Sequence, residues 1–181
     1  MHCKNLALRT LASLALAIAA LGGAAAAFAS EAANDSARVS VTWTDPAQFT
    51  EMRYSHGLNR PKPESWLNEM RKTVVRRADR LLKPGQRLDV TITDVKLAGQ
   101  YEPWRGPNYN DVRIVKSLYP PSIDLRFSLV DADGKVIDSG ERKLRDPAFL
   151  NRGSTNSSES YRFEKRLLKD WLAREFEKKD A

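Results

Sequence analysis

The sequence predicts an α+β domain: a four-stranded, mostly antiparallel sheet with two helices on one face. Four segments alternate apolar and polar residues, which is typical of half-buried strands. Two other segments repeat apolar residues every three or four positions, as amphipathic helices do. The predicted order is strand, helix, strand, strand, strand, helix. Placing both helices on one face of the sheet buries all of these apolar stripes together.

The first strand is predicted over residues 38–44, where valines and a tryptophan alternate with polar residues. Asp45, followed by proline, ends this strand and can cap a short turn. Residues 53–63 contain glycine and two prolines without any period, so they are predicted to form a loop. A helix is predicted over residues 64–82, before Lys-Pro-Gly. Its apolar face consists of Leu67, Met70, Val74, Ala78 and Leu81.

Three further strands are predicted over residues 86–97, 122–130 and 136–144. The apolar parity shifts by one residue within the first of these strands. This shift indicates a β-bulge near Thr93 and Asp94 that returns the following apolar residues to the core. The segment Asp-Ala-Asp-Gly-Lys between the last two strands is typical of a hairpin connection.

The final helix is predicted over residues 158–176. Ser157 or Ser158 can cap its first turn, in which Glu159 complements the helix dipole. Its apolar stripe consists of Leu168, Trp171, Leu172 and Phe176.

The N-terminal segment is predicted to be a secretory signal peptide. Lys4 and Arg9 precede an apolar run over residues 11–27, and the Ala-Phe-Ala triplet that ends at Ala29 has the form of a cleavage site. The alternative is a permanent membrane anchor. It is disfavoured because the run is mostly alanine and no basic stop follows it.

Cleavage after Ala29 divides the chain into three parts. Residues 1–29 form the signal peptide, residues 30–37 are predicted to be a disordered leader, and residues 38–178 form a single α+β domain. The signal favours a periplasmic location, with no stable membrane span after cleavage.

The composition restricts the chemistry that the mature protein can perform. The 181-residue chain has one cysteine and two histidines, and Cys3 and His2 both lie within the predicted signal. Disulfides, cysteine nucleophiles and multi-histidine metal sites are therefore excluded, and no cofactor or metal is expected. The full chain has a net charge of +7, and +5 remains once Lys4 and Arg9 are removed with the signal. This positive charge favours contact with anionic envelope components, whereas export argues against nucleic acid as a partner.

The most unusual segment is the loop over residues 99–113, which has more aromatic and charged residues than a plain connection needs. Trp104 and Tyr101 are predicted to be apolar anchors for a ligand or protein partner, since Trp, Tyr and Arg dominate binding hot spots. In the alternative interpretation, these aromatics fold back onto the core and the charges pair with one another. Residues 112–115 are compatible with a short strand. The candidate site residues are Tyr101, Glu102, Trp104, Arg105, Tyr109, Asp111 and Arg113.

Specific roles follow from the side-chain chemistry in this loop. Arg105 and Arg113 are expected to engage acidic groups, and Glu102 is expected to orient the arginine side chains. A second interpretation is a carboxylate-based hydrolase of cell-wall glycans, in which Asp94 works with Glu102 or Asp111 as acid and base. No spacing in the sequence selects one such pair.

Two further groups of residues have simpler interpretations. His56 follows Ser55, but neighbouring loop residues rarely give the geometry of a nucleophile and its base, so an exposed histidine is favoured. A basic stripe at helical spacing is predicted to be a solvated helix face, with lipid phosphates as its alternative partner. The stripe consists of Lys72, Arg76, Arg80 and Lys83.

Several segments resemble a known family. They are residues 91–99 (TITDVKLAG) with residues 101–104 (YEPW), residues 119–123 (YPPSI), residues 131–136 (DADGKV) and residues 140–146 (GERKLRD). The chain is similar, from the first strand to the last helix, to the bacterial exported domain-of-unknown-function family number 3016. This resemblance supports the boundaries and the periplasmic address and implies no activity, cofactor or catalytic residue.

Together these observations predict an exported, periplasmic, non-enzymatic protein that binds an envelope component through its 99–113 loop. The partner is expected to be an envelope protein or an anionic envelope polymer. A purely structural envelope protein, whose loop is packed scaffold, is the remaining alternative.

Overall fold

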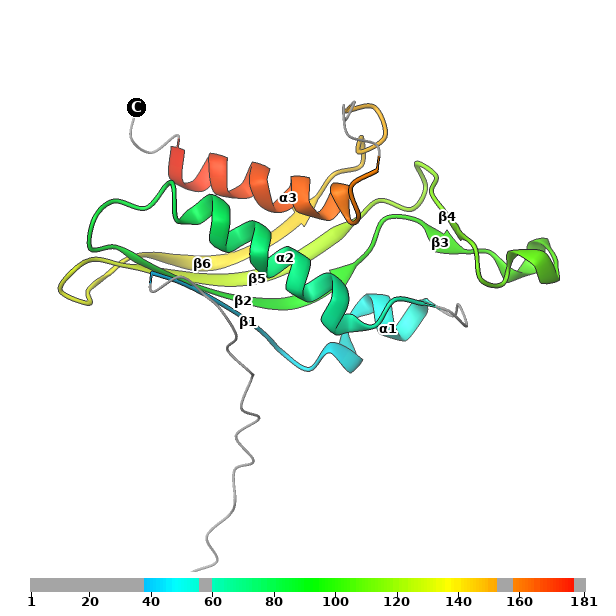
Figure 1. Cartoon of the computed structure of the whole chain (residues 1–181), viewed down its shortest axis with the longest axis horizontal. Helices are drawn as coiled ribbons and strands as arrows, with labels where there is room; N and C mark the ends of the chain where they lie inside the picture. The colour runs from blue at the N-terminus through cyan, green and yellow to red at the C-terminus, as the bar shows by residue number, and fades with distance from the viewer. Residues whose placement is uncertain (1–37, 56–59, 153–157, 178–181) are drawn as a thin grey trace, which may run out of the picture.

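The connection between the first two strands determines the topology of the sheet. In the computed structural model, which describes residues 38–55, 60–152 and 158–177, β1 (Val39–Trp43) is parallel to β2 (Arg87–Lys96) (Figure 1). Parallel neighbours need a long crossover, and a helix supplies it here. The predicted signal peptide, leader and His56 lie outside the described residues.

The other strands of the main sheet pair by antiparallel ladders. β5 (Ser122–Val130) lies between β2 and β6 (Val136–Arg145), which gives the order β1-β2-β5-β6. The predicted α+β class and its four main strands are therefore present, in a mixed sheet with one parallel pair. The predicted bulge is confirmed, because the β2–β5 register shifts between Ile92 and Asp94.

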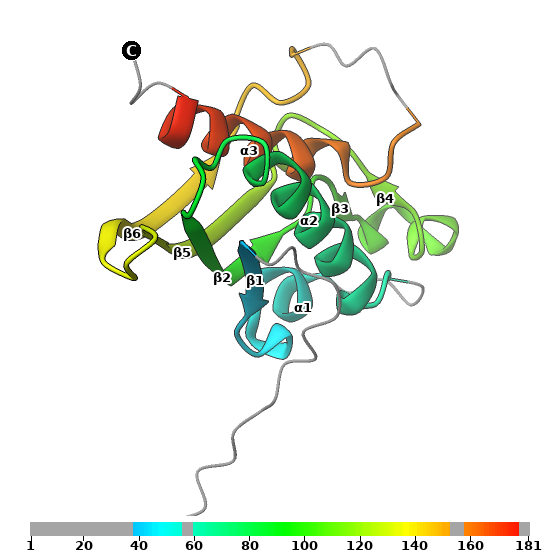
Figure 2. The ribbon, with the colours of Figure 1, turned by 60° about the vertical axis from the view of Figure 1, so that its left-hand side comes forward.

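The two main helices, α2 (Pro63–Ala78) and α3 (Arg162–Leu172), cover the same face of the sheet (Figures 1 and 2). A π-helical turn, η4 (Ala173–Glu177), continues α3. The helices run parallel, since Ser65 faces Tyr161 and Glu69 binds Lys165, with the same separation of 96 residues in both pairs. No helix of the described ranges is long and apolar enough to cross a bilayer.

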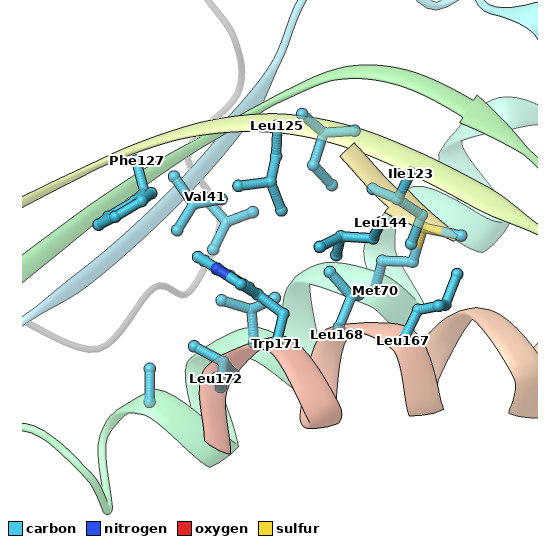
Figure 3. Packing of buried hydrophobic residues seen from close by; sticks show 14 of the residues in the cluster. Val41, Met70, Ile123, Leu125, Phe127, Leu144, Leu167, Leu168, Trp171 and Leu172 are labelled. Atoms are coloured by element: carbon cyan, nitrogen blue, oxygen red, sulfur yellow. The ribbon is translucent and has the colours of Figure 1, made fainter. Parts of the chain in front are cut away.

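The hydrophobic core fills the layer between these helices and the sheet (Figure 3). The ring of Trp171 packs edge-on against that of Phe127, with the ring centroids 5.7 Å apart. The bulge in β2 matters here because it keeps both Val95 and Leu97 buried. Figure 3 labels the side chains of Val41, Met70, Ile123, Leu125, Phe127, Leu144, Leu167, Leu168, Trp171 and Leu172.

Two details in the first half of the chain differ from the sequence-based prediction. A short helix, α1 (Thr50–Tyr54), follows the turn η1 (Pro46–Gln48) and extends into the predicted loop. The first long helix ends at Ala78, and turns occupy the following residues. The connection between β1 and α2 therefore contains a helix, α1, that the sequence pattern did not predict.

The start of the last helix is also different. Of the two predicted capping residues, Ser157 lies outside the described residues, and Ser158 precedes α3, which begins at Arg162. The predicted first-turn residue Glu159 also precedes the helix. Tyr161 is the N-cap, with a left-handed φ of 56° and no side-chain capping bond. The Glu159 carboxylate is instead used by Lys165, at 3.2 Å.

Candidate functional site

The 99–113 loop forms a projecting arm, defined here as residues 99–114. Its base is a two-stranded ladder between β3 (Gln100–Tyr101) and β4 (Arg113–Ile114). Two 3₁₀ turns, η2 (Pro103–Arg105) and η3 (Pro107–Tyr109), form its tip. The arm extends beyond the end of the main sheet, on the side away from the β5–β6 hairpin (Figure 1).

Glycine is required at the joint between the two turns of the tip. Gly106 has a φ of 122°, a conformation that residues with a Cβ rarely adopt. Proline begins each turn and fixes its first φ angle. The shape of the tip is therefore encoded by Pro-x-x-Gly-Pro in the sequence.

Two buried carboxylates hold the base of the arm. Glu51 of α1 accepts a hydrogen bond from the Leu97 amide at 3.0 Å, and Glu164 of α3 accepts one from the Ala98 amide at 2.6 Å. Burial raises the pKa of the Glu164 carboxyl above its ordinary value. Consecutive backbone amides at the end of β2 are thus attached to two different helices.

Arg113 closes this base from the opposite strand. Its guanidinium forms an ion pair with Glu51 and donates to the Ala98 and Gly99 carbonyl oxygens at 3.2 and 3.1 Å. It also lies over the Tyr101 ring, 4.9 Å from the centroid. Through these bonds, Arg113 fixes the arm to the body of the domain.

A second polar cluster braces the middle of the arm. The buried Glu102 carboxylate accepts bonds from Lys116 Nζ at 2.7 and 2.8 Å and from the Tyr119 hydroxyl at 2.8 Å. The bonds from Lys116 and Tyr119 hold the pKa of Glu102 below its ordinary value, and the bond to Glu102 raises the pKa of Tyr119. Arg105 Nε is farther away, 3.6 Å from Glu102.

The tip presents the remaining aromatic side chains to solvent. Trp104 is 71% exposed and Tyr109 is 40% exposed. The Arg105 guanidinium lies 5.1 Å from the centroid of the Tyr109 ring, which is a cation–π distance. Asp111 is also exposed, at the end of the tip that leads into β4.

The seven predicted site residues therefore divide into two groups. Tyr101 and Glu102 are only 5% and 2% exposed, so their side chains pack within the arm and its base and are largely covered from solvent. Arg113 belongs with them, and Glu51, rather than Glu102, orients it. The residues presented at the tip are Trp104, Arg105, Tyr109 and Asp111.

The carboxylates considered for hydrolysis have structural partners. Asp94 accepts bonds from the Thr50 amide at 2.6 Å and from the Thr50 hydroxyl at 2.7 Å, and so caps the start of α1. Glu102 is in the ion pair with Lys116. Asp111 lies on the exposed tip. This arrangement gives no support to an acid–base pair among these three carboxylates.

Sequence reasoning missed four residues that position the arm: Glu51, Glu164, Lys116 and Tyr119. Glu51 and Glu164 lie 46 and 66 residues from the amides that they bind, so no local pattern marks them. Within the described ranges, no group of three or more His, Cys, Asp or Glu residues is placed to hold a metal ion.

Comparison with known families gives one decisive match. A family model described as "Protein of unknown function (DUF3016)" matches residues 37–174. The chain belongs to the DUF3016 family. The matched region extends from β1 through α3, so the arm and the residues that hold it are within the DUF3016 domain.

Other comparisons add little about function. No curated protein matches this DUF3016 chain. Two solved structures are similar to it, both of the PelC dodecamer from Paraburkholderia phytofirmans, in space groups C2 and P6. The C2 structure is 11% identical over 75% of this chain and 83% of its own, with a TM-score of 0.35. The P6 structure is 11% identical over 75% and 86%, with a TM-score of 0.31.

Proposed function

We propose that this protein is exported to the periplasm and acts there without catalysis, by binding an envelope protein through the tip of its arm. The observation that carries the proposal is the 71% exposure of Trp104 on a braced, projecting element. An exposed tryptophan contributes nothing to the core. It offers a large apolar area to a partner.

The chemistry of the tip resembles that of protein-binding hot spots. Trp, Tyr and Arg are the residue types enriched at such positions, and here Trp104, Arg105 and Tyr109 lie within six residues. Arg105 supplies a charge-assisted donor beside the Tyr109 ring. Packed scaffold would place Trp104 in the interior, as it places Tyr101.

The bonds at the base and middle of the arm favour binding by lowering its entropic cost. Glu51, Glu164 and Glu102 attach the arm to residues of α1, α3 and the 115–121 connection before any partner arrives. A binding element that is ordered in advance loses less conformational freedom on association. The projecting shape suits insertion into a groove of another protein better than it suits enclosure of a small ligand.

The periplasmic address rests on the signal-like segment of residues 1–29. N-terminal sequencing of the protein recovered from the periplasmic fraction tests it, with a new terminus at Ser30 expected. Recovery from the cytoplasm with Met1 or His2 at the terminus would contradict export.

Photocrosslinking tests the binding site. A photoreactive amino acid at position 104 is expected to capture one defined protein in living cells. The matched control places it at Ile137, which is 50% exposed at the start of β6, at the opposite end of the sheet from the arm. The same proteins captured from both positions, or no capture from position 104, would contradict the proposal.

A further inference from the structure

A basic groove lies between α2 and α3, away from the arm. It has a volume of about 430 Å³, and its charged lining comes from both helices, the turn after α2 and the segment before α3. The two helices run parallel and lie side by side (Figure 2), and residues of both line the groove. The charged residues that line it are Arg76, Arg77, Arg80, Lys169, Glu159 and Asp170.

The two acids of this groove form ion pairs with cations outside its lining. Asp170 binds Arg152 at 2.8 Å, and Glu159 binds Lys165 at 3.2 Å. Neither Arg152 nor Lys165 is among the lining residues. Arg152 and Lys165 also bind Asp146 and Glu69, so they neutralise the two groove acids only in part. Four cations nevertheless outnumber two acids in the lining.

The cations of the groove are not balanced in the same way. Arg77 forms an ion pair with Glu177. Within the part of the chain that the structure describes, no carboxylate forms an ion pair with Arg76, Arg80 or Lys169. Three exposed cations, from α2, the turn after it and α3, thus line one groove without a direct ion pair.

We infer that this groove binds phosphate groups. A guanidinium presents paired N–H donors that match the oxygens of a phosphate, and two guanidinium groups and an ammonium line this groove together. Like charges one helical turn apart repel, and a bound anion removes that repulsion. The macrodipole favours cations at a helix C-terminus, but it does not explain why cations of two helices converge.

The structure also separates this site from the basic stripe in the sequence. Of the four residues in that stripe, only Arg76 and Arg80 line the groove. Lys72 binds Glu69 at 3.1 Å, and Lys83 lines a different pocket beside Leu129. Lys169, which is 89 positions after Arg80, completes the site instead.

Two probes distinguish a lipid phosphate from a free one. The first is vesicles of equal parts phosphatidylcholine and phosphatidylglycerol. The measured quantity is the amount of protein bound to these vesicles minus the amount bound to pure phosphatidylcholine vesicles. This subtraction removes any contribution of the apolar residues 11–27. The second probe is inorganic phosphate, titrated while the amide resonances of the full-length protein are recorded.

A charge-matched pair of variants tests the location. The groove variant combines Arg76→Gln, Arg80→Gln and Lys169→Gln. The control variant combines Lys62→Gln, Lys135→Gln and Lys143→Gln, which removes the same charge from exposed positions outside the groove. We expect the groove variant to weaken binding roughly tenfold or more, and the control variant to change it less than about twofold.

Each outcome decides the proposal. A vesicle excess that only the groove variant loses supports a lipid phosphate as the ligand. Shifts at groove residues with inorganic phosphate, without a vesicle excess, support a free phosphate. Equal losses in both variants, or no response to either probe, would overturn the inference.

Discussion

Arg113 of the arm and Glu51 of α1 form a partly buried ion pair, although 62 residues separate them in the sequence. The same Glu51 side chain accepts a bond from the Leu97 amide, and the same guanidinium binds two carbonyl oxygens. This pair connects the arm, the end of β2 and α1, and so it couples the position of the proposed binding tip to the folded core.

The Glu51–Arg113 pair predicts a large effect of removing one partner. Arg113→Ala leaves the Glu51 carboxylate buried without its main counter-charge, and we expect the free energy of unfolding to fall by about 3 kcal/mol. Urea denaturation measures this change. The matched control is Arg126→Ala, which breaks the exposed pair with Glu141 and is expected to cost less than about 1 kcal/mol. Equal losses in the two variants would contradict the anchoring role.

Glu164 predicts an unusual dependence of stability on pH. Burial raises the pKa of this carboxyl in the folded state, so the folded state binds its proton more tightly than the unfolded state. Its contribution is fully present below the ordinary value of 4.5 and is lost as the pH rises through the raised pKa. Glutamine does not ionise, so the Glu164→Gln variant does not lose this stability as the pH rises. We therefore expect the free energy of unfolding of Glu164→Gln, relative to that of wild type, to increase as the pH rises from 4.5 through the raised pKa of Glu164.

The contributions of Glu69 and Glu102 to stability depend on pH in the opposite direction from that of Glu164. Hydrogen bonds from Lys165 and Lys72 lower the pKa of Glu69, and those from Lys116 and Tyr119 lower that of Glu102. These contributions are present above 4.5 and are lost as the pH falls through the lowered values. Both wild type and Glu164→Gln contain Glu69 and Glu102, so the difference between their free energies of unfolding reports the Glu164 carboxyl alone. A difference that stays constant between pH 4 and 8 would refute the assignment.

Tyr119→Phe tests the brace in the middle of the arm. It removes the hydroxyl that donates to Glu102 and keeps the ring. The pKa of Glu102 is then expected to rise towards its ordinary value, and the Arg105 and Gly106 amides are expected to exchange hydrogen faster. Carboxyl titration and hydrogen exchange measure these two effects. Unchanged exchange in the tip would mean that the brace does not order it.

Gly106→Ala tests the backbone of the tip. The φ of 122° is strained for alanine, although no atom lies within 4 Å of the added Cβ. We expect a cost of about 1–2 kcal/mol, paid by rearrangement of the tip rather than by a clash. Weaker crosslinking from position 104 would accompany the change. Gly134→Ala, with a φ of 81° and also no neighbouring atom within 4 Å, is the control, because it strains the distant hairpin and should leave crosslinking intact.

The strands could be predicted because burial on one face imposes a period of two. The bulge in β2 was visible as a shift in the parity of its apolar residues, and pairing with β5 confirms it. The start of α3 was not predictable in this way. Serines before the helix suggested a cap, whereas packing places Tyr161 at that position with a left-handed backbone.

The candidate site was predictable in composition but not in orientation. The density of aromatic and charged residues marked the 99–113 segment, yet nothing in the local pattern separated the buried Tyr101 from the exposed Trp104. That distinction depends on Arg113, Glu51 and Glu164, which lie on elements far apart in the chain. Long-range polar contacts therefore determine which residues the arm presents.

The most direct test of the binding proposal is Trp104→Ala, with stability and complex formation measured on the same variant. We predict that its free energy of unfolding stays within about 0.5 kcal/mol of wild type, because the side chain is mostly in solvent. The complex defined by crosslinking at position 104 should no longer co-purify with it. A marked loss of stability with the complex retained would contradict the proposal and make the arm a structural element.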